Sequence, residues 1–146
     1  MAKQIYVNMP VRELRRSIDF FTKLGYQFDP QFTDDNGACL VISESIFVML
    51  LEEGFFSSFT TKPVSDAHKS TEMILCLSLD SREEVQALVS SALAAGGTAP
   101  LEANDHGFMY QHGFQDLDGH VWEVMYLEPE GPEEDEEYEE EEEEAG

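Results

Sequence analysis

The chain has 146 residues, 42% hydrophobic and 11% aromatic, which is enough to bury one core of domain size. Its formal net charge is −23, but 13 of the 31 acidic residues fall in 128–146, which contains no Lys or Arg. The remainder still carries 18 acidic against 8 basic residues, and this excess argues against binding to nucleic acid or to an anionic membrane.

Leader segments and cysteines indicate the compartment. No secretory leader opens the sequence, and no apolar run approaches the roughly 20 residues that span a bilayer. Cys39 and Cys76 lie in apolar stretches and form no CxxC pair, so we expect buried free thiols in a reducing environment. These features together predict a cytoplasmic protein.

The first half of the chain predicts a strand, a helix and three further strands. A β-rich segment covers 3–11, and the helix follows at 12–25, where Gly25 ends it. Short apolar segments bounded by turn residues then predict strands at 26–33, 37–43 and 45–52. The helix prediction depends on apolar residues at helical spacing, namely Leu14, Ile18, Phe21 and Leu24.

The second half repeats this order. A strand is predicted at 72–79, and Ser81 with Glu84 forms a capping box that opens a helix over 82–95. Gly96 and Gly97 end the helix, and strands are expected at about 98–102, 107–114 and 120–127. A period of roughly 70 residues in this pattern indicates an internal duplication.

Two segments lie outside the repeated pattern. The connector, 53–71, contains Phe55, Phe56 and Phe59, which we expect to anchor it on the core; a pocket lid or a dimer contact is the alternative. The tail, 128–146, is dominated by glutamate and predicts a disordered extension. A role in solubility is expected for the tail, with an interaction with a basic partner as the alternative.

Two stretches, "VNMPVRELRRSIDFFTKLGY" and "FQDLDGHVWEVMYLE", together with the repeated order of elements, resemble the vicinal oxygen chelate superfamily, which includes glyoxalase and bleomycin-resistance proteins. The resemblance implies an α+β fold of two βαβββ modules, at about 4–52 and 72–127, within one domain at 1–127. Their sheets would curl into an incomplete barrel with the helices outside. A cleft inside holds a divalent metal in many members, and a homodimer is the usual assembly.

The resemblance also implies four metal-ligand positions, one on the first and one on the last strand of each module. They fall on Tyr6 and Met49 in the first module and on Ile74 and Glu123 in the second. Met and Ile side chains offer no suitable donor, and a neutral tyrosine is a poor one. Asn8 is the only extra oxygen donor near the first strand, so we expect no metal site.

Strand alternation assigns a side to Glu123. In 120–127, Val121, Glu123 and Met125 share one face, while Trp122 and Val124 share the other. The turn "DLDG" predicts a three-residue hairpin loop closed by Gly119, which would pair Asp116 with His120, Phe114 with Trp122 and Gly113 with Glu123. Glycine opposite glutamate would leave a hollow beside the carboxylate, with Gln111 and Tyr6 near it. Desolvation there would favour the neutral acid, which suits a general base or a hydrogen-bond donor; a merely satisfied carboxylate is the alternative.

These residues are compatible with two functions. The first is that of a metal-free protein that binds a small organic molecule in the cleft. The alternative is a glyoxalase-like lyase or isomerase in which Glu123 is the metal ligand or general base. The expected cleft residues are Tyr6, Asn8, Met49, Cys76, Met109, Gln111 and Met125, and methionines suit irregular ligands because they adapt to them.

Overall fold

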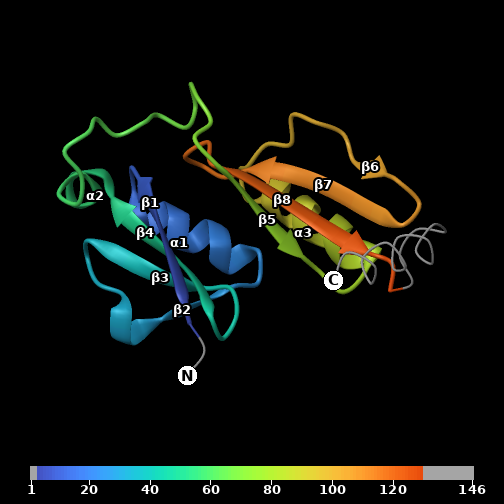
Figure 1. The fold of residues 1–146 in the computed structure, drawn as a ribbon. Coiled ribbons are helices and arrows are strands. Elements are labelled where there is room, and N and C mark those ends of the chain that lie inside the picture. Colours follow the sequence, from blue (N-terminus) through green and yellow to red (C-terminus); the bar gives the residue numbers. More distant parts are fainter. Residues whose placement is uncertain (1–2, 130–146) are drawn as a thin grey trace, which may run out of the picture.

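The computed structural model describes residues 3–129, and within this range the chain forms two four-stranded mixed sheets and two main helices (Figure 1). The strand orders are β1-β4-β3-β2 and β5-β8-β7-β6. The first sheet consists of β1 (Ile5–Val11), β2 (Gln27–Asp29), β3 (Gly37–Val41) and β4 (Ile46–Glu52). The second consists of β5 (Ile74–Ser78), β6 (Asn104–Asp105), β7 (Met109–Gln115) and β8 (Val121–Leu127). The predicted α+β class is confirmed.

The two sheets repeat one topology and one register. In each sheet the first and last strands of the module pair in parallel, and the other neighbours pair antiparallel. The predicted internal repeat is therefore confirmed in topology. The shared register makes the following positions equivalent in the two modules: Asn8 and Cys76, Cys39 and Gly113, Met49 and Glu123.

Local sequence explains both main helices. The first, α1 (Leu14–Lys23), buries Leu14, Phe20 and Phe21 on one face and ends before Gly25, whose φ is 99°. The second, α3 (Arg82–Ala94), begins at the predicted capping box.

In that box the Ser81 hydroxyl accepts a hydrogen bond from the Glu84 N–H at 3.1 Å. The Glu84 carboxylate in turn accepts one from the Asp80 N–H at 2.7 Å. The Glu84 N–H, a helix donor that would otherwise be unsatisfied, is thus paired, which confirms the predicted start of the helix.

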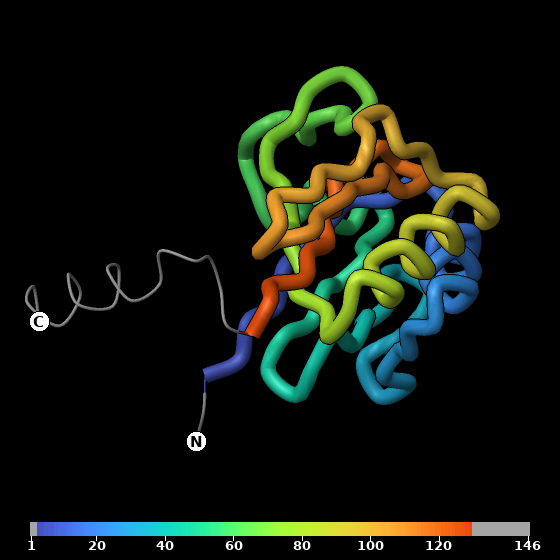
Figure 2. Tube along the Cα trace, turned by 90° about the vertical axis from the view of Figure 1, so that its right-hand side faces the viewer, coloured from blue at the N-terminus to red at the C-terminus, as the bar shows by residue number. Residues whose placement is uncertain are grey.

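The helices lie on the same side of both sheets and leave the other side open (Figures 1 and 2). This layered arrangement confirms the predicted incomplete barrel with helices outside; among the described residues, no strand pairs β1 with β5. Both modules share one core. Phe20 of α1 lies 6.3 Å from Phe114 between ring centres, and Phe21 lies 5.3 Å from Trp122. Aromatic contacts between elements of different modules thus join the halves.

The hairpin turn at 116–120 also joins the modules. Its Asp118 accepts hydrogen bonds from the Arg12 N–H at 3.0 Å and from the Ser17 hydroxyl at 3.2 Å. The His120 Nε2 lies 2.7 Å from the carbonyl oxygen of Pro10. Polar groups of this turn therefore fix the start of β8 against the end of β1 and the first turn of α1.

Two strand predictions are wrong in extent. The strand expected at 26–33 stops at Asp29, because Pro30 opens a single 3-10 turn, Pro30–Phe32. The strand expected at about 98–102 is reduced to one bridge between Thr98 and Gln115, and the short β6 follows later. Pro100 cannot donate a ladder hydrogen bond, which favours the irregular path.

The connector contains a short helix, α2 (Glu53–Ser57), which the sequence pattern did not predict. Phe56 is half-buried, whereas Phe55 is 39% exposed and Phe59 is 68% exposed, so only part of the aromatic group is anchored. No helix among residues 3–129 is long and apolar enough to cross a membrane. Of the predicted tail, 130–146 lies outside the described residues; Glu128 is described and lies 3.5 Å from Arg82.

Candidate functional site

The hairpin of β7 and β8 positions Glu123 as the sequence predicted. Glu123 lies opposite Gly113, and Phe114 lies opposite Trp122. Trp122 and Val124 are 1% and 0% exposed on the helix side, so Glu123 points to the open side of the sheet. The turn closes at Gly119 with a φ of 86°. The predicted register is confirmed.

Gly113 leaves space beside the carboxylate. A Cβ placed on this glycine would lie 3.0 Å from the Trp122 carbonyl oxygen and 3.6 Å from the Glu123 Cγ. Any larger side chain would extend over the open face of the strand and fill the space next to Glu123. The hollow therefore requires a residue without a side chain at position 113.

The hollow beside Glu123 has a volume of about 300 Å³. Its floor is the open face of β5, β7 and β8, and its wall is the segment before β6. The Glu123 side chain is half-buried at this hollow. The lining of the hollow includes polar residues, Gln111, Glu102 and Asn104, and apolar residues, Ile74, Leu101 and Val121.

Two of the polar groups in this hollow are available to a ligand. Among residues 3–129, neither the Glu123 carboxylate nor the Gln111 amide forms a side-chain hydrogen bond or an ion pair. Each has hydrogen-bonding capacity that only water or a ligand can use. The hollow therefore presents an acceptor and a donor–acceptor group next to apolar side chains, which is the composition typical of small-molecule sites.

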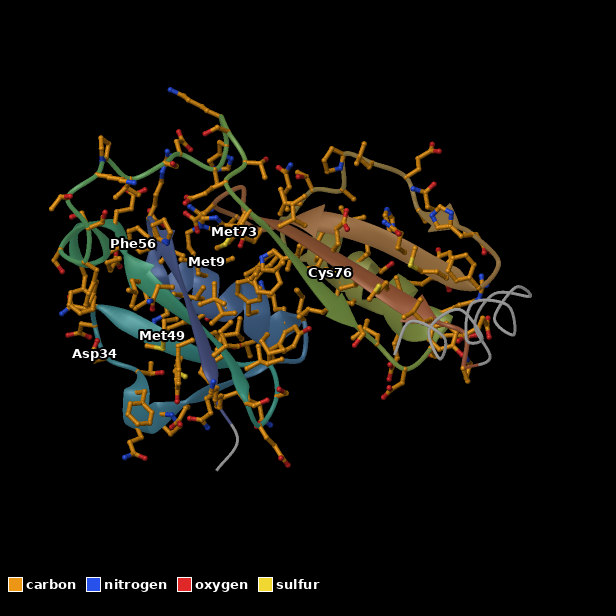
Figure 3. The ribbon with its side chains drawn as sticks, viewed as in Figure 1. Met9, Asp34, Met49, Phe56, Met73 and Cys76 are labelled. Carbon is orange, nitrogen blue, oxygen red and sulfur yellow. The ribbon has the colours of Figure 1, made fainter. Side chains whose placement is uncertain are left out.

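A second hollow, of about 250 Å³, lies under the connector. It is lined by residues of β1, the connector and the start of β8, including Asn8, Phe56, Met73 and His120. Figure 3 shows Met73 between the two sheets, with Met9 and Phe56 on the first-module side. Asn8, a predicted cleft residue, therefore belongs to this second hollow and not to the one beside Glu123.

The other predicted cleft residues lie on open sheet faces but do not all converge. Tyr6 stacks on Phe47 with ring centres 4.8 Å apart and bonds to Gln4, so the expectation that it lies beside Glu123 is not met. Met49 and Cys76 lie on separate sheets (Figure 3). On β7 and β8, Met125 lies opposite Gln111, whereas Met109 lies opposite Leu127 at the far end.

Cys76 lies directly opposite Glu123 in the parallel pair of β5 and β8. Cys39 is buried as expected, but Cys76 is exposed, so the expectation of two buried thiols is wrong for Cys76. Partial desolvation, and then the negative charge of Glu123, raise the pKa of the Cys76 thiol. A thiol with a raised pKa is less ionised at neutral pH, and the thiolate is the nucleophilic form. The neighbourhood of Glu123 therefore suppresses cysteine chemistry at this position.

The side chains at the four metal-ligand positions that the resemblance implies do not fit a divalent cation. Glu123 supplies one carboxylate, but Met49 and Ile74 supply no hard donor, and the Tyr6 hydroxyl bonds to Gln4. Across residues 3–129, no three His, Cys, Asp or Glu side chains lie where they could share a metal ion.

Sequence reasoning missed the contacts that hold the wall segment at 100–107 in place. Arg82 holds it through the Asp105 carboxylate at 2.7 Å and the Gly107 carbonyl oxygen at 2.9 Å. The His112 ring bonds to the Leu101 carbonyl oxygen at 3.0 Å. The Arg82 guanidinium, hydrogen-bonded to Asp105, lowers the pKa of that carboxyl.

Comparison with known proteins supports the fold. No family model matches the sequence, and no curated protein does. Among solved structures, a hypothetical protein from S. aureus is similar over 87% of this chain and 95% of its own, with 26% identity and a TM-score of 0.73.

Two further structures carry family names. A glyoxalase/bleomycin resistance protein/dioxygenase family enzyme from Burkholderia phytofirmans covers 86% of this chain and 99% of its own, with 19% identity and a TM-score of 0.71. A glyoxalase-related enzyme from Fulvimarina pelagi covers 86% of this chain and 88% of its own, with 18% identity and a TM-score of 0.71. At such identities the likeness concerns the fold. The repeated topology, the shared register and these neighbours together show that the chain has the vicinal oxygen chelate fold of the glyoxalase and bleomycin-resistance proteins.

Proposed function

We propose that this protein binds a small organic molecule in the hollow beside Glu123, without the divalent metal of many proteins with this fold. One observation carries the proposal. A hollow of about 300 Å³ combines the half-buried Glu123 and Gln111, both without a protein partner among residues 3–129, with the apolar side chains of Ile74, Leu101 and Val121. Apolar walls supply affinity and a few polar groups fix orientation in such sites.

A glyoxalase-like lyase or isomerase is the second candidate, because the same unpartnered carboxylate of Glu123 would be free to take a proton from a substrate. Glyoxalase chemistry requires a Lewis acid. This requirement argues against the second candidate, since Tyr6, Met49 and Ile74 replace three of the four implied metal ligands. Two measurements distinguish these candidate functions: elemental analysis of the purified protein, and its melting temperature with and without chelator or added nickel and zinc. Stoichiometric metal with a shift of several degrees would favour the enzyme.

The binding proposal is tested by filling the hollow. Gly113→Val should place a branched side chain beside Glu123 and abolish ligand-induced stabilisation in a screen of small amphipathic compounds. Ser90→Val on the exposed face of α3 is the matched control and should bind as the parent does. Equal stabilisation of parent and Gly113→Val by the same compounds, with the variant shown to be folded, would place binding elsewhere.

The homodimer implied by the resemblance stays a prediction. Exposed apolar side chains on the free edges of the two sheets support it, because such edges associate readily. Ile5 is 54% exposed on β1, and Ile74 is 52% exposed on β5. Light scattering during size-exclusion chromatography should give twice the 16.5 kDa chain mass; a monomer would contradict the prediction.

A further inference from the structure

We infer that the two hollows form one elongated groove, and that its ligand is an amphipathic organic cation. This inference rests on the proposed function and extends it to a ligand class. Thr71 and Val121 line both hollows, so the two spaces adjoin at these residues. The groove therefore runs from Phe56 and Asn8, under the connector, to Gln111 and Glu123 on the second sheet.

The charge of the groove selects a cation. Its walls include three carboxylates, those of Glu72, Glu102 and Glu123, and none of the lining residues is Lys or Arg. The two lining histidines, His112 and His120, each direct Nε2 to a backbone carbonyl oxygen, at 3.0 and 2.7 Å. A carboxylate-bearing ligand would lie among three carboxylates here, whereas an ammonium group gains Coulomb energy and a hydrogen bond.

Arg82, the basic side chain that contacts the wall segment, is already paired. Arg82 bonds to Asp105 at 2.7 Å and lies 3.5 Å from Glu128. It therefore offers no free positive charge to an anionic ligand at this end of the groove. The acidic excess of the body outside the tail acts in the same direction, since it attracts cations toward the protein.

The shape of the groove places the two halves of the ligand. The ammonium group lies at Glu123, the half-buried carboxylate, with Gln111 beside it. The apolar half passes Val121 and reaches Met73 and Phe56 in the second hollow. A flexible methionine and an aromatic ring suit an irregular or aromatic apolar group.

The charge preference is tested with three probes that share one apolar body: 4-phenylbutylamine, 4-phenylbutanol and 4-phenylbutyrate. Titration followed by backbone amide NMR should show the amine binding about tenfold more tightly than the alcohol, and the butyrate more weakly than both. Glu123→Gln should bring amine and alcohol to within about twofold, while Glu83→Gln on the exposed start of α3 leaves the preference unchanged.

The length of the groove is tested with 6-phenylhexylamine. Two further methylenes buried in the second hollow should improve affinity by about tenfold, and Phe56→Ala should remove most of that gain while leaving 4-phenylbutylamine binding in place. The longer probe should shift amide resonances at both Asn8 and Gln111. Shifts confined to one hollow, or no gain with length, would overturn the joined groove.

The outcomes separate this inference from the proposed function. If all three charge types bind with equal affinity at Gln111 and Gly113, small-molecule binding stands and the cation assignment is overturned. The same holds if 4-phenylbutyrate binds most tightly. If no probe of any charge or length perturbs these residues, while the amide spectrum shows a folded protein, the proposed function fails together with the inference.

Discussion

The open faces of the two sheets share one backbone plan and differ in what fills them. In the first module, Met49 lies opposite Cys39, whose side chain is 1% exposed, and the nearby Tyr6 and Phe47 rings stack. In the second module, the equivalent pair is Glu123 and Gly113, and a hollow of about 300 Å³ lies beside them. Duplicated topology therefore does not duplicate the site.

The difference shows which residues decide between a filled and a hollow sheet face. A thioether and a thiol occupy the space in the first module, whereas the second has no side chain at one position and a carboxylic acid at the other. On the helix-facing sides of the sheets, the second module has the larger side chains. Its Phe114 and Trp122 occupy the positions equivalent to Leu40 and Val48 of the first module. The second module thus has the bulkier core-facing pair and the emptier open face.

The largest expected effect is a loss of stability at a core-facing position, and it differs between the equivalent positions of the two modules. Trp122→Ala should lower the free energy of unfolding by about 3–5 kcal/mol, because Trp122 is 1% exposed, stacks on Phe114 and donates to Asp116 at 3.0 Å. The equivalent Val48→Ala removes only two methyl groups and should cost about 2 kcal/mol. Chemical denaturation measures both, and an equal or larger loss for Val48→Ala would contradict the comparison.

An intermediate effect comes from exchanging the equivalent open-face residues. Glu123→Met should change the free energy of unfolding by less than about 1 kcal/mol, since this half-buried carboxylate has no protein partner among residues 3–129. Met49→Glu should cost about 1–3 kcal/mol, because it places a charge against the buried Cys39. Equilibrium denaturation in parallel gives both values. Equal costs would mean that the two faces are energetically alike.

The smallest effect concerns the thiol beside Glu123. Because the charge of Glu123 contributes to the raised pKa of Cys76, Glu123→Gln should lower that pKa and raise the thiolate fraction near pH 8. Alkylation by iodoacetamide should accelerate about two- to threefold, with the pH–rate curve displaced to lower pH. Mass spectrometry assigns the site, and the buried Cys39 serves as the internal control. An unchanged alkylation rate would mean that the charge of Glu123 has no effect on the Cys76 thiol.

Local patterns determined much of this protein from the sequence. Residue alternation and the "DLDG" turn fixed the β7–β8 register, so Glu123 opposite Gly113 followed from short-range rules. The capping box at Ser81 likewise depends on neighbours within one helical turn. Such features are set by interactions between residues close in the chain, and the backbone repeat of two βαβββ modules follows from them.

Only the tertiary structure decided what surrounds the carboxylate. Tyr6 was expected beside Glu123 but stacks on Phe47 in the other sheet, and the wall at 100–107 depends on a distant contact with Arg82. The relative placement of the two sheets rests on Phe20 and Phe21 packing against the second module. Periodicity tells which way a side chain points, but the groups that it meets depend on packing between elements far apart in the sequence.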